Sequence, residues 1–150
     1  MNNEEIEELL YRENLTLASI SSRATAFFLD ELLLSILLMI ALWDSFTSAQ
    51  TVEDIILLTN SFVLEYMLMK LIYQAFFVTK YGATLGKIAM KIRVIDVKTL
   101  DNPDFLHSLN RSFFRIISEM FFYLGFLWGV FNPTRQTWHD KTAQTLVVNV

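Results

Sequence analysis

Three long apolar blocks constrain what this chain can fold into more than any other feature of the sequence. The blocks cover about 24–43, 55–78 and 113–131. A helix of about 20 apolar residues is long enough to cross the hydrocarbon core of a bilayer. Only 19% of the residues are charged, whereas about a quarter are charged in a typical soluble domain. The chain is therefore expected to be an all-α membrane protein, with the lipid bilayer as its solvent.

The first two blocks predict transmembrane helices, and the third block is less regular. Thr51 and Asp54 have the spacing of a capping box just before the second block. The third block is shorter, is interrupted by charges, and holds Gly125 and Gly129, where a helix can bend. A simple crossing would carry the basic residues of the C-terminal tail to the far side. We therefore expect a third hydrophobic helix that is bent or spanning, and the bent form returns the tail to the side of the 79–112 loop.

The distribution of lysine and arginine predicts the orientation of these segments. No basic residue lies between Arg23 and Lys70, whereas the stretch from Lys80 to Arg111 holds six, counting both ends. Loops rich in lysine and arginine stay on the cytoplasmic side of a membrane. The N-terminus and the 79–112 loop are therefore expected in the cytoplasm, and the acidic loop between the first two blocks outside.

The segments outside the apolar blocks are small. Residues 91–97 alternate in polarity and are rich in β-branched side chains, and 145–150 has a similar composition. If the tail is cytoplasmic, these two strands can pair into a small β element beside the membrane domain at 19–150. Residues 1–18 predict an acidic amphipathic helix. Its acidic face favours contact with a basic protein surface over contact with an anionic membrane.

Ionisable residues inside the apolar blocks are the candidate functional residues. Arg23 and Asp30 are seven residues apart, on nearly the same helix face and roughly 10 Å apart along the axis. A lone charge at this depth costs on the order of 2.5–3.5 kcal/mol, so Asp30 is expected to be protonated, paired or in a wet cavity. In the second block, Lys70 can pair with Glu65 or Asp30. An ion or proton site and a structural pin between helices both stay open.

Other chemistries have little support in the sequence. The chain has no cysteine and two histidines, and no ligand set has metal spacing, so no metal is expected. No cofactor motif or nucleophile–base pair is present, so we expect neither a cofactor nor an enzyme. The net charge of -4 gives no basic footprint for nucleic acid. The spacing Gly125-x-x-x-Gly129 matches a packing motif of membrane helices, and it can serve a dimer contact or a bend.

The stretch YGATLGK resembles a truncated phosphate-binding loop. It lacks the four-residue gap between the glycines of such a loop, and it lacks the serine or threonine that follows the lysine. It is better explained as part of a loop at the membrane surface, to which we assign Thr84, Gly86, Lys87, Arg93 and Arg111. Basic residues at such a turn favour an anionic leaflet, so Lys80 and Lys87 are expected near lipid phosphates.

Four motifs follow one another over about residues 19–150. The stretch SRATAFFLD supplies an arginine–aspartate pair, and HDKTAQTLVV supplies a last aspartate. The stretch YGATLGKIAMKIRVID supplies a T-x-G-K…R-V loop, and a late arginine precedes the third block. These motifs resemble those of the RDD family of small bacterial membrane proteins. The matching residues are Arg23, Asp30, Thr84, Gly86, Lys87, Arg93, Arg111 and Asp140. Lys91 and Gln144 depart from the family pattern, which usually has glycine there, and both changes are expected to affect turns.

The resemblance implies a polytopic protein of the bacterial inner membrane with a role in ion or solute transport. In that role Asp30 would carry the ion or proton, Arg23 would control its ionisation, and Asp140 would close the site from the cytoplasm. Three spans rarely enclose a pathway, so a homo-oligomer or a larger membrane complex is implied. The alternative is a non-catalytic accessory or scaffold subunit, which residues 1–18 would attach to a larger assembly.

Overall fold

The computed structural model describes residues 1–150 as nine helices and one two-stranded sheet. The helices are α1 (Asn3–Arg12), α2 (Ile20–Ala41), α3 (Trp43–Ser48), α4 (Val52–Ser61), α5 (Val63–Tyr81), α6 (Leu85–Ala89), α7 (Phe105–Met120), α8 (Leu124–Phe131) and α9 (Trp138–Thr142). The strands are β1 (Ile92–Asp96) and β2 (Thr145–Asn149).

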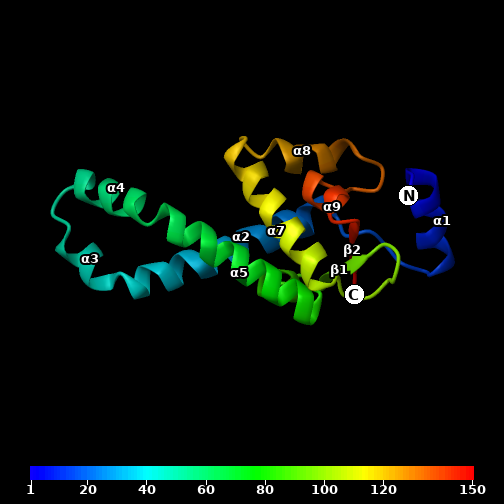
Figure 1. The fold of residues 1–150 in the computed structure, drawn as a ribbon, viewed down its shortest axis with the longest axis horizontal. Helices are drawn as coiled ribbons and strands as arrows, with labels where there is room; N and C mark the ends of the chain where they lie inside the picture. Colours follow the sequence, from blue (N-terminus) through cyan, green and yellow to red (C-terminus); the bar gives the residue numbers. More distant parts are fainter.

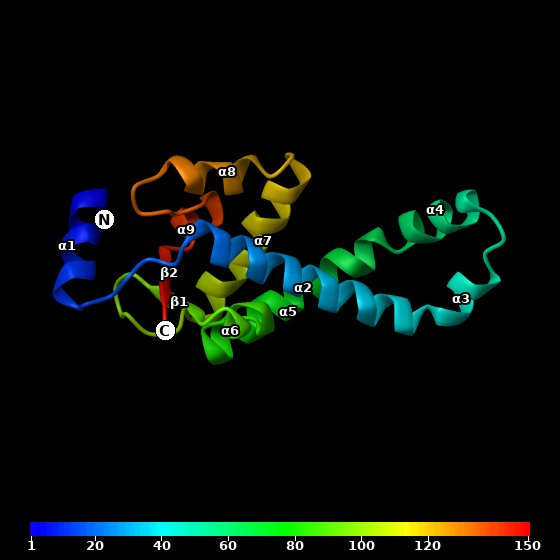
Figure 2. The same ribbon diagram turned by 180° about the vertical axis from the view of Figure 1, so that it is seen from behind.

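The first two apolar blocks form a long helical hairpin that extends away from the rest of the chain (Figures 1 and 2). Helix α2 leads into the short α3, and the chain returns through α4 and α5, which meet at a bend of 52°. The expected capping box of Thr51 and Asp54 begins α4. Helix α2 alone is long and apolar enough to cross a membrane, and the number of such spans rises to 3 if each bent helix pair counts as one.

The third apolar block is bent, as one of the two expected forms predicts. Helices α7 and α8 meet at 104°. The bend lies at Phe122 and Tyr123, which have φ of 54° and 61°, and not at the glycines of α8. Figure 2 shows α8 running back from the end of α7 toward α9 and the sheet. The tail therefore returns to the same end of the molecule as the 79–112 loop.

The two expected strands pair into an antiparallel sheet, in the register Ile92↔Asn149 to Asp96↔Thr145. Helix α1 packs its apolar side on this sheet. The resulting core contains Ile6, Leu10, Ile95, Val97, Leu146 and Val148. Helix α1 is thus a part of the fold, and its glutamates remain exposed.

Each strand follows a five-residue helix that has a threonine at its N-cap. Thr84 begins α6 before β1, and Thr137 begins α9 before β2. Lys91 and Gln144 lie just before the strands, in the left-handed region with φ of 55° and 52°. These are the two positions at which the chain departs from the pattern of the family that it resembles. The expectation that both departures affect turns is confirmed.

Replacing Lys91 or Gln144 with glycine is expected to stabilise the protein. A non-glycine residue in the left-handed region costs about 1–2 kcal/mol, and the greater freedom of glycine in the unfolded chain offsets about 0.5–1 kcal/mol of that gain. Each variant should therefore raise the melting temperature in nonionic detergent. Lys98→Gly changes a turn residue without positive φ and should not raise it. An equal or lower melting temperature for Lys91→Gly would show that the positive φ of Lys91 does not destabilise the protein.

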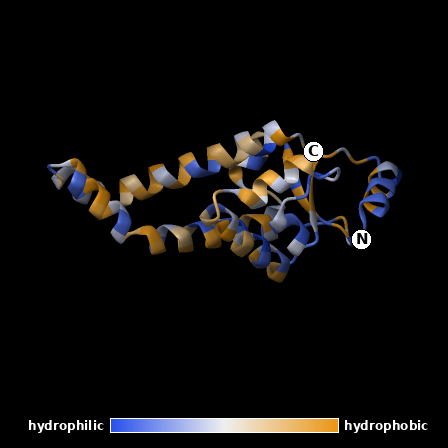
Figure 3. Cartoon of the chain, turned by 90° about the horizontal axis from the view of Figure 1, so that it is seen from above, coloured by the Kyte–Doolittle hydropathy of each residue, from blue (hydrophilic) through white to orange (hydrophobic).

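The helices bury polar side chains and expose apolar ones, which is the reverse of the distribution in a soluble protein. On α7 the buried residues are Ser108, Arg111, Ser112, Arg115 and Ser118. Large apolar side chains such as Phe105, Leu106 and Phe113 are exposed on the same helix. Figure 3 shows that most residues along the α2–α5 hairpin are hydrophobic, and many of them, such as Ile36, Leu64 and Ile72, are exposed. An exposed apolar surface of this extent marks a contact with a membrane or with another protein.

Candidate functional site

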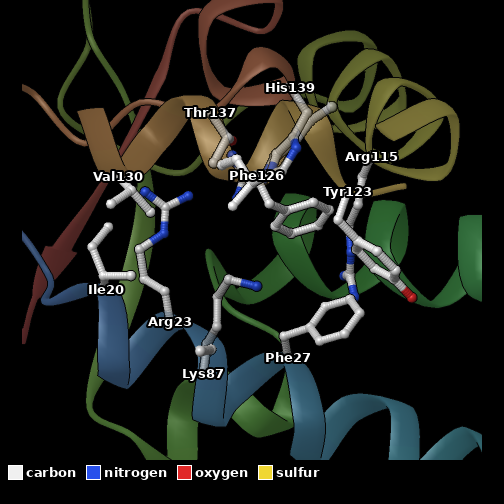
Figure 4. Close-up of a pocket in the computed structure, with 13 residues that line it drawn as sticks. Ile20, Arg23, Phe27, Lys87, Arg115, Tyr123, Phe126, Val130, Thr137 and His139 are labelled. Carbon is white, nitrogen blue, oxygen red and sulfur yellow. The ribbon is translucent and has the colours of Figure 1, made fainter. Parts of the chain in front are cut away.

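A cavity of about 250 Å³ lies beside α2, α7, α8 and α9 (Figure 4). The basic residues on its wall are Arg23, Lys87, Arg111, Arg115 and His139. The other lining residues are Ile20, Ala24, Phe27, Tyr123, Phe126, Leu127, Val130 and Thr137. No carboxylate lines the cavity. The wall therefore combines positive charge with apolar and aromatic surface.

Asp140 positions two of the arginines behind this wall. Its side chain is fully buried. Arg23 donates to its Oδ2 at 2.5 Å, and Arg111 donates to its Oδ1. The backbone N–H of Thr137 adds a third bond, at 3.0 Å. One carboxylate thus holds two guanidinium groups, and this triad carries one excess positive charge.

Asp30 is fully buried and has the further partners that its distance from Arg23 requires, but it has no contact with Arg23, which the family resemblance implied would control its ionisation. It accepts hydrogen bonds from the Tyr73 hydroxyl at 2.7 Å, the Thr84 hydroxyl at 2.6 Å and the Gly86 N–H at 2.9 Å. Seven residues on a straight helix separate two side chains by roughly 10 Å, farther than both can span comfortably. Arg23 therefore turns to Asp140, and neutral donors of α5 and the α6 segment hold Asp30.

Gly86 is required where α6 crosses α2. A Cβ at this position would lie 2.2 Å from the Ala26 carbonyl oxygen and 2.8 Å from Asp30 Oδ1. Gly86→Ala should therefore push α6 away and destabilise the protein by about 1–3 kcal/mol. Thermal unfolding in detergent measures the change. Leu85→Ala, at an exposed neighbouring residue, is the control, and equal melting temperatures for the two variants would contradict this close contact.

A second charged cluster lies between α2, α5 and α7. Lys70 bonds Glu31 at 2.9 Å and also contacts Glu119. Arg115 lies 3.5 Å from Glu31 and 3.4 Å from Glu119. The Tyr66 hydroxyl donates to Glu31 at 3.1 Å. Two acids and two bases balance, so this cluster carries no net charge.

The expected pairs of Lys70 with Glu65 and with Asp30 do not occur. Glu65 and Lys70 are five residues apart, which turns them to different faces of the helix. Lys70 faces the interior, whereas Glu65 is exposed on the wall of a shallow apolar groove between α2 and α5. Glu65 is therefore outside the charged network.

Lys87 is the basic residue of the cavity whose side chain has no hydrogen-bond or ion-pair partner. Its side chain is 8% exposed, no hydrogen bond or ion pair involves its ammonium group, and Figure 4 shows that group pointing into the cavity. Burial lowers the pKa of Lys87 well below its usual value, and the charges of Arg111 and Arg115 lower it further. The pKa of His139 is also lowered, first by burial and then by Arg111. The cavity therefore presents unpaired donors in a positive environment.

The residues expected at a membrane-surface loop are mostly buried, which corrects that interpretation. Thr84 and Gly86 bond Asp30, Arg111 bonds Asp140, and Lys87 lines the cavity. Arg93 alone stays partly exposed, donating to Asn102 at 3.0 Å. The acids that bind these residues, Asp30 and Asp140, lie outside the loop. The loop sequence alone therefore does not show that its residues are buried.

The two glycines of α8 pack within the chain. A Cβ on Gly125 would lie 2.0 Å from the Ser118 hydroxyl, and one on Gly129 would lie 2.8 Å from Cγ2 of Thr137. Both residues are buried. Their small size lets α8 approach α7 and α9 and so closes one side of the cavity.

Sequence reasoning did not assign Arg115 or His139 to the site. A signal for Arg115 exists, because Arg111, Arg115 and Glu119 recur at every fourth residue and so share one face of a helix. His139 has no comparable signal, since its position depends on how α9 packs against α8 (ring contact with Phe126, 5.0 Å between centroids).

Comparison with known proteins gives a family match. The model of the RDD family matches residues 17–144, which include every basic residue of the cavity. An uncharacterized protein of Rickettsia prowazekii (strain Madrid E) is 27% identical over 81 residues, 52% of this chain and 44% of that protein. The match thus spans less than half of the relative's length. No solved structure matches the chain.

Proposed function

The chain belongs to the RDD family, and we propose that it is a polytopic protein of the bacterial inner membrane that binds a small organic anion and takes part in its transport. The observation that carries this proposal is the cavity wall, which has five basic side chains and no carboxylate. Such a wall attracts negative charge and rejects cations.

The reversed polarity of the helices supports a membrane location. Membrane helices bury ionisable residues toward the interior of the bundle and expose apolar ones to lipid. Helix α7 follows this rule, and α2 meets the length and hydropathy of a span. The excess of lysine and arginine in the 79–112 loop favours a cytoplasmic location for that loop and for the N-terminus.

The hydrogen bonds of Asp30 and Asp140 favour a structural role for these carboxylates over a role in ion transport. Asp30 is surrounded by three donors, and Asp140 is shared by two arginines and a backbone N–H. A cation would have to displace these donors to reach either oxygen. An anion, by contrast, meets the unpaired side-chain nitrogen of Lys87, whose charged form the anion stabilises. We therefore assign Asp30 and Asp140 to holding the helices and the arginines in place.

Transport through this chain requires further protein, because three spans rarely enclose a pathway. Glu65 offers a place for it. A carboxylate on a lipid-facing wall is costly, and Glu65 is exposed beside apolar residues of α2 and α5. A helix of a second copy or of a larger complex that covers this groove would remove that cost.

The alternative function, an accessory or scaffold subunit, is favoured by α1. The sheet fixes α1 through Ile6 and Leu10, so its exposed glutamates form a rigid acidic surface. This surface suits a basic protein partner. In that case, the variant Glu4→Gln/Glu7→Gln/Glu8→Gln would lose the partner in pull-downs while the membrane domain remained folded.

Calorimetry in nonionic detergent tests the anion proposal. Benzenesulfonate keeps its charge at all relevant pH values, and phenyltrimethylammonium is a matched cation. We expect the first to bind and the second not to bind. Lys87→Met should weaken benzenesulfonate binding about tenfold, the loss of one charged hydrogen bond. Lys80→Met removes an exposed lysine and should have no effect.

The pH dependence of this binding follows from Lys87. Burial holds its pKa below the usual value, and a bound anion favours its charged form. Binding should therefore take up a proton and tighten as the pH falls toward the pKa of Lys87 in the empty protein, and the affinity should level off below that pKa. Lys87→Met should remove the part of this dependence that Lys87 causes, and His139, whose pKa burial also lowers, accounts for any remainder.

The outcomes separate the two functions. Binding together with uptake of labelled benzenesulfonate into proteoliposomes supports transport. Binding without uptake supports the accessory role. Preference for the cation would contradict the anion proposal.

A further inference from the structure

We propose that the anion in the cavity is a phosphomonoester headgroup that belongs to a bilayer lipid and enters from the membrane side. This inference rests on the proposed function and names the ligand class of the same site. A free phosphomonoester has the same headgroup chemistry, and the experiment below distinguishes the two sources.

The polarity of the cavity changes from its mouth to its end. The lining residues with large exposed surface are Tyr123 at 47%, Leu127 at 52% and Val130 at 52%, together with Ala24. The basic residues Lys87, Arg111 and His139 are 8%, 3% and 2% exposed. The entrance is therefore apolar and the charges lie deep. A water-soluble anion would have to cross an apolar entrance, whereas a lipid would leave its chain there.

The outer surface of α8 continues this apolar entrance. Leu124, Trp128 and Phe131 are 50%, 51% and 85% exposed. An acyl or isoprenyl chain that leaves the cavity would run along these side chains. The cavity itself, at about 250 Å³, is below the roughly 300–1,000 Å³ of sites that enclose a whole drug-sized ligand. It accommodates a headgroup and a short part of a chain, and the rest of the ligand must lie outside.

The donors at the deep end fit a group with several acceptor oxygens. No hydrogen bond or ion pair involves the side-chain nitrogen of Lys87, which lines the cavity, and Nε of Arg111 donates no hydrogen bond. Arg23 and Arg111 share a single carboxylate. A phosphomonoester carries about -1.5 to -2 charges and three acceptor oxygens. Arginine and lysine are the usual ligands of such a group. A zwitterionic lipid would place a cation beside the same basic wall.

Native mass spectrometry with defined lipids tests the inference on the full-length protein. The probes are dioleoyl phosphatidic acid, dioleoyl phosphatidylcholine and inorganic phosphate. We expect phosphatidic acid to bind at least about tenfold more tightly than phosphatidylcholine, and more tightly than inorganic phosphate. Its phosphate group contacts the basic residues of the cavity, and its acyl chains contact the apolar entrance. Lys87→Met should remove the preference between the two lipids, and Lys80→Met should keep it.

A second variant makes the test independent of the folding of Lys87→Met. Ala24→Phe changes an exposed residue at the entrance and should weaken phosphatidic acid binding about tenfold, with binding of inorganic phosphate unchanged. Equal affinity for the two lipids, with benzenesulfonate still bound, would overturn the lipid assignment alone and indicate a free anion. Loss of benzenesulfonate binding as well would overturn the proposed function.

Discussion

Asp140→Asn is expected to lower the free energy of unfolding by about 3–5 kcal/mol, the cost of leaving buried charges uncompensated. Asp140 is fully buried and is the acid partner of both Arg23 and Arg111. Without its charge, two guanidinium groups face each other in the interior. Unfolding in detergent by a graded denaturant measures the loss, and reduced amounts of protein in membranes should accompany it.

Glu8→Gln provides the matched control for this prediction. It neutralises an exposed acid of α1 that has no ion-pair partner, and its stability should equal that of the wild type. A loss below about 1 kcal/mol for Asp140→Asn, the range of exposed ion pairs, would mean that Asp140 does not hold the two arginines.

Lys70→Met is expected to have the second-largest effect, about 3 kcal/mol. It leaves Glu31 and Glu119 with Arg115 as the only base of the cluster. The double variant Lys70→Met/Glu31→Leu restores the balance of charges and should recover at least half of the loss. A double-mutant cycle measures this coupling. Additive losses in the double variant would show that the cluster does not act as a unit.

The sequence predicts the elements of the fold well because each has a local cause. The capping box at Thr51, the alternation in 91–97 and the length of the apolar blocks depend on neighbouring residues, and the structure has the corresponding elements. The prediction that the third block bends at Gly125 or Gly129 was wrong. Phe122 and Tyr123 adopt positive φ, which no pattern of aromatic residues predicts, whereas the nearby glycines are needed for packing.

The candidate site was harder to predict because its pairings join distant segments. Arg23 and Asp140 are 117 residues apart, and Asp30 and Gly86 are 56 apart. Periodicity places Arg23 and Asp30 on one helix face, but it does not say which residues of other helices are nearer. Lys87 lies inside because its neighbours Thr84 and Gly86 bond the buried Asp30, whereas the loop sequence alone places it at the surface.

A crystal structure of the protein with 4-bromobenzenesulfonate would show directly whether the cavity binds an anion, because anomalous scattering locates the bromine without bias. We expect a bromine peak between Phe27 and Phe126, with the sulfonate against Lys87 and the arginines of the cavity. An empty cavity, with the bromine only at exposed lysines such as Lys80, would contradict it.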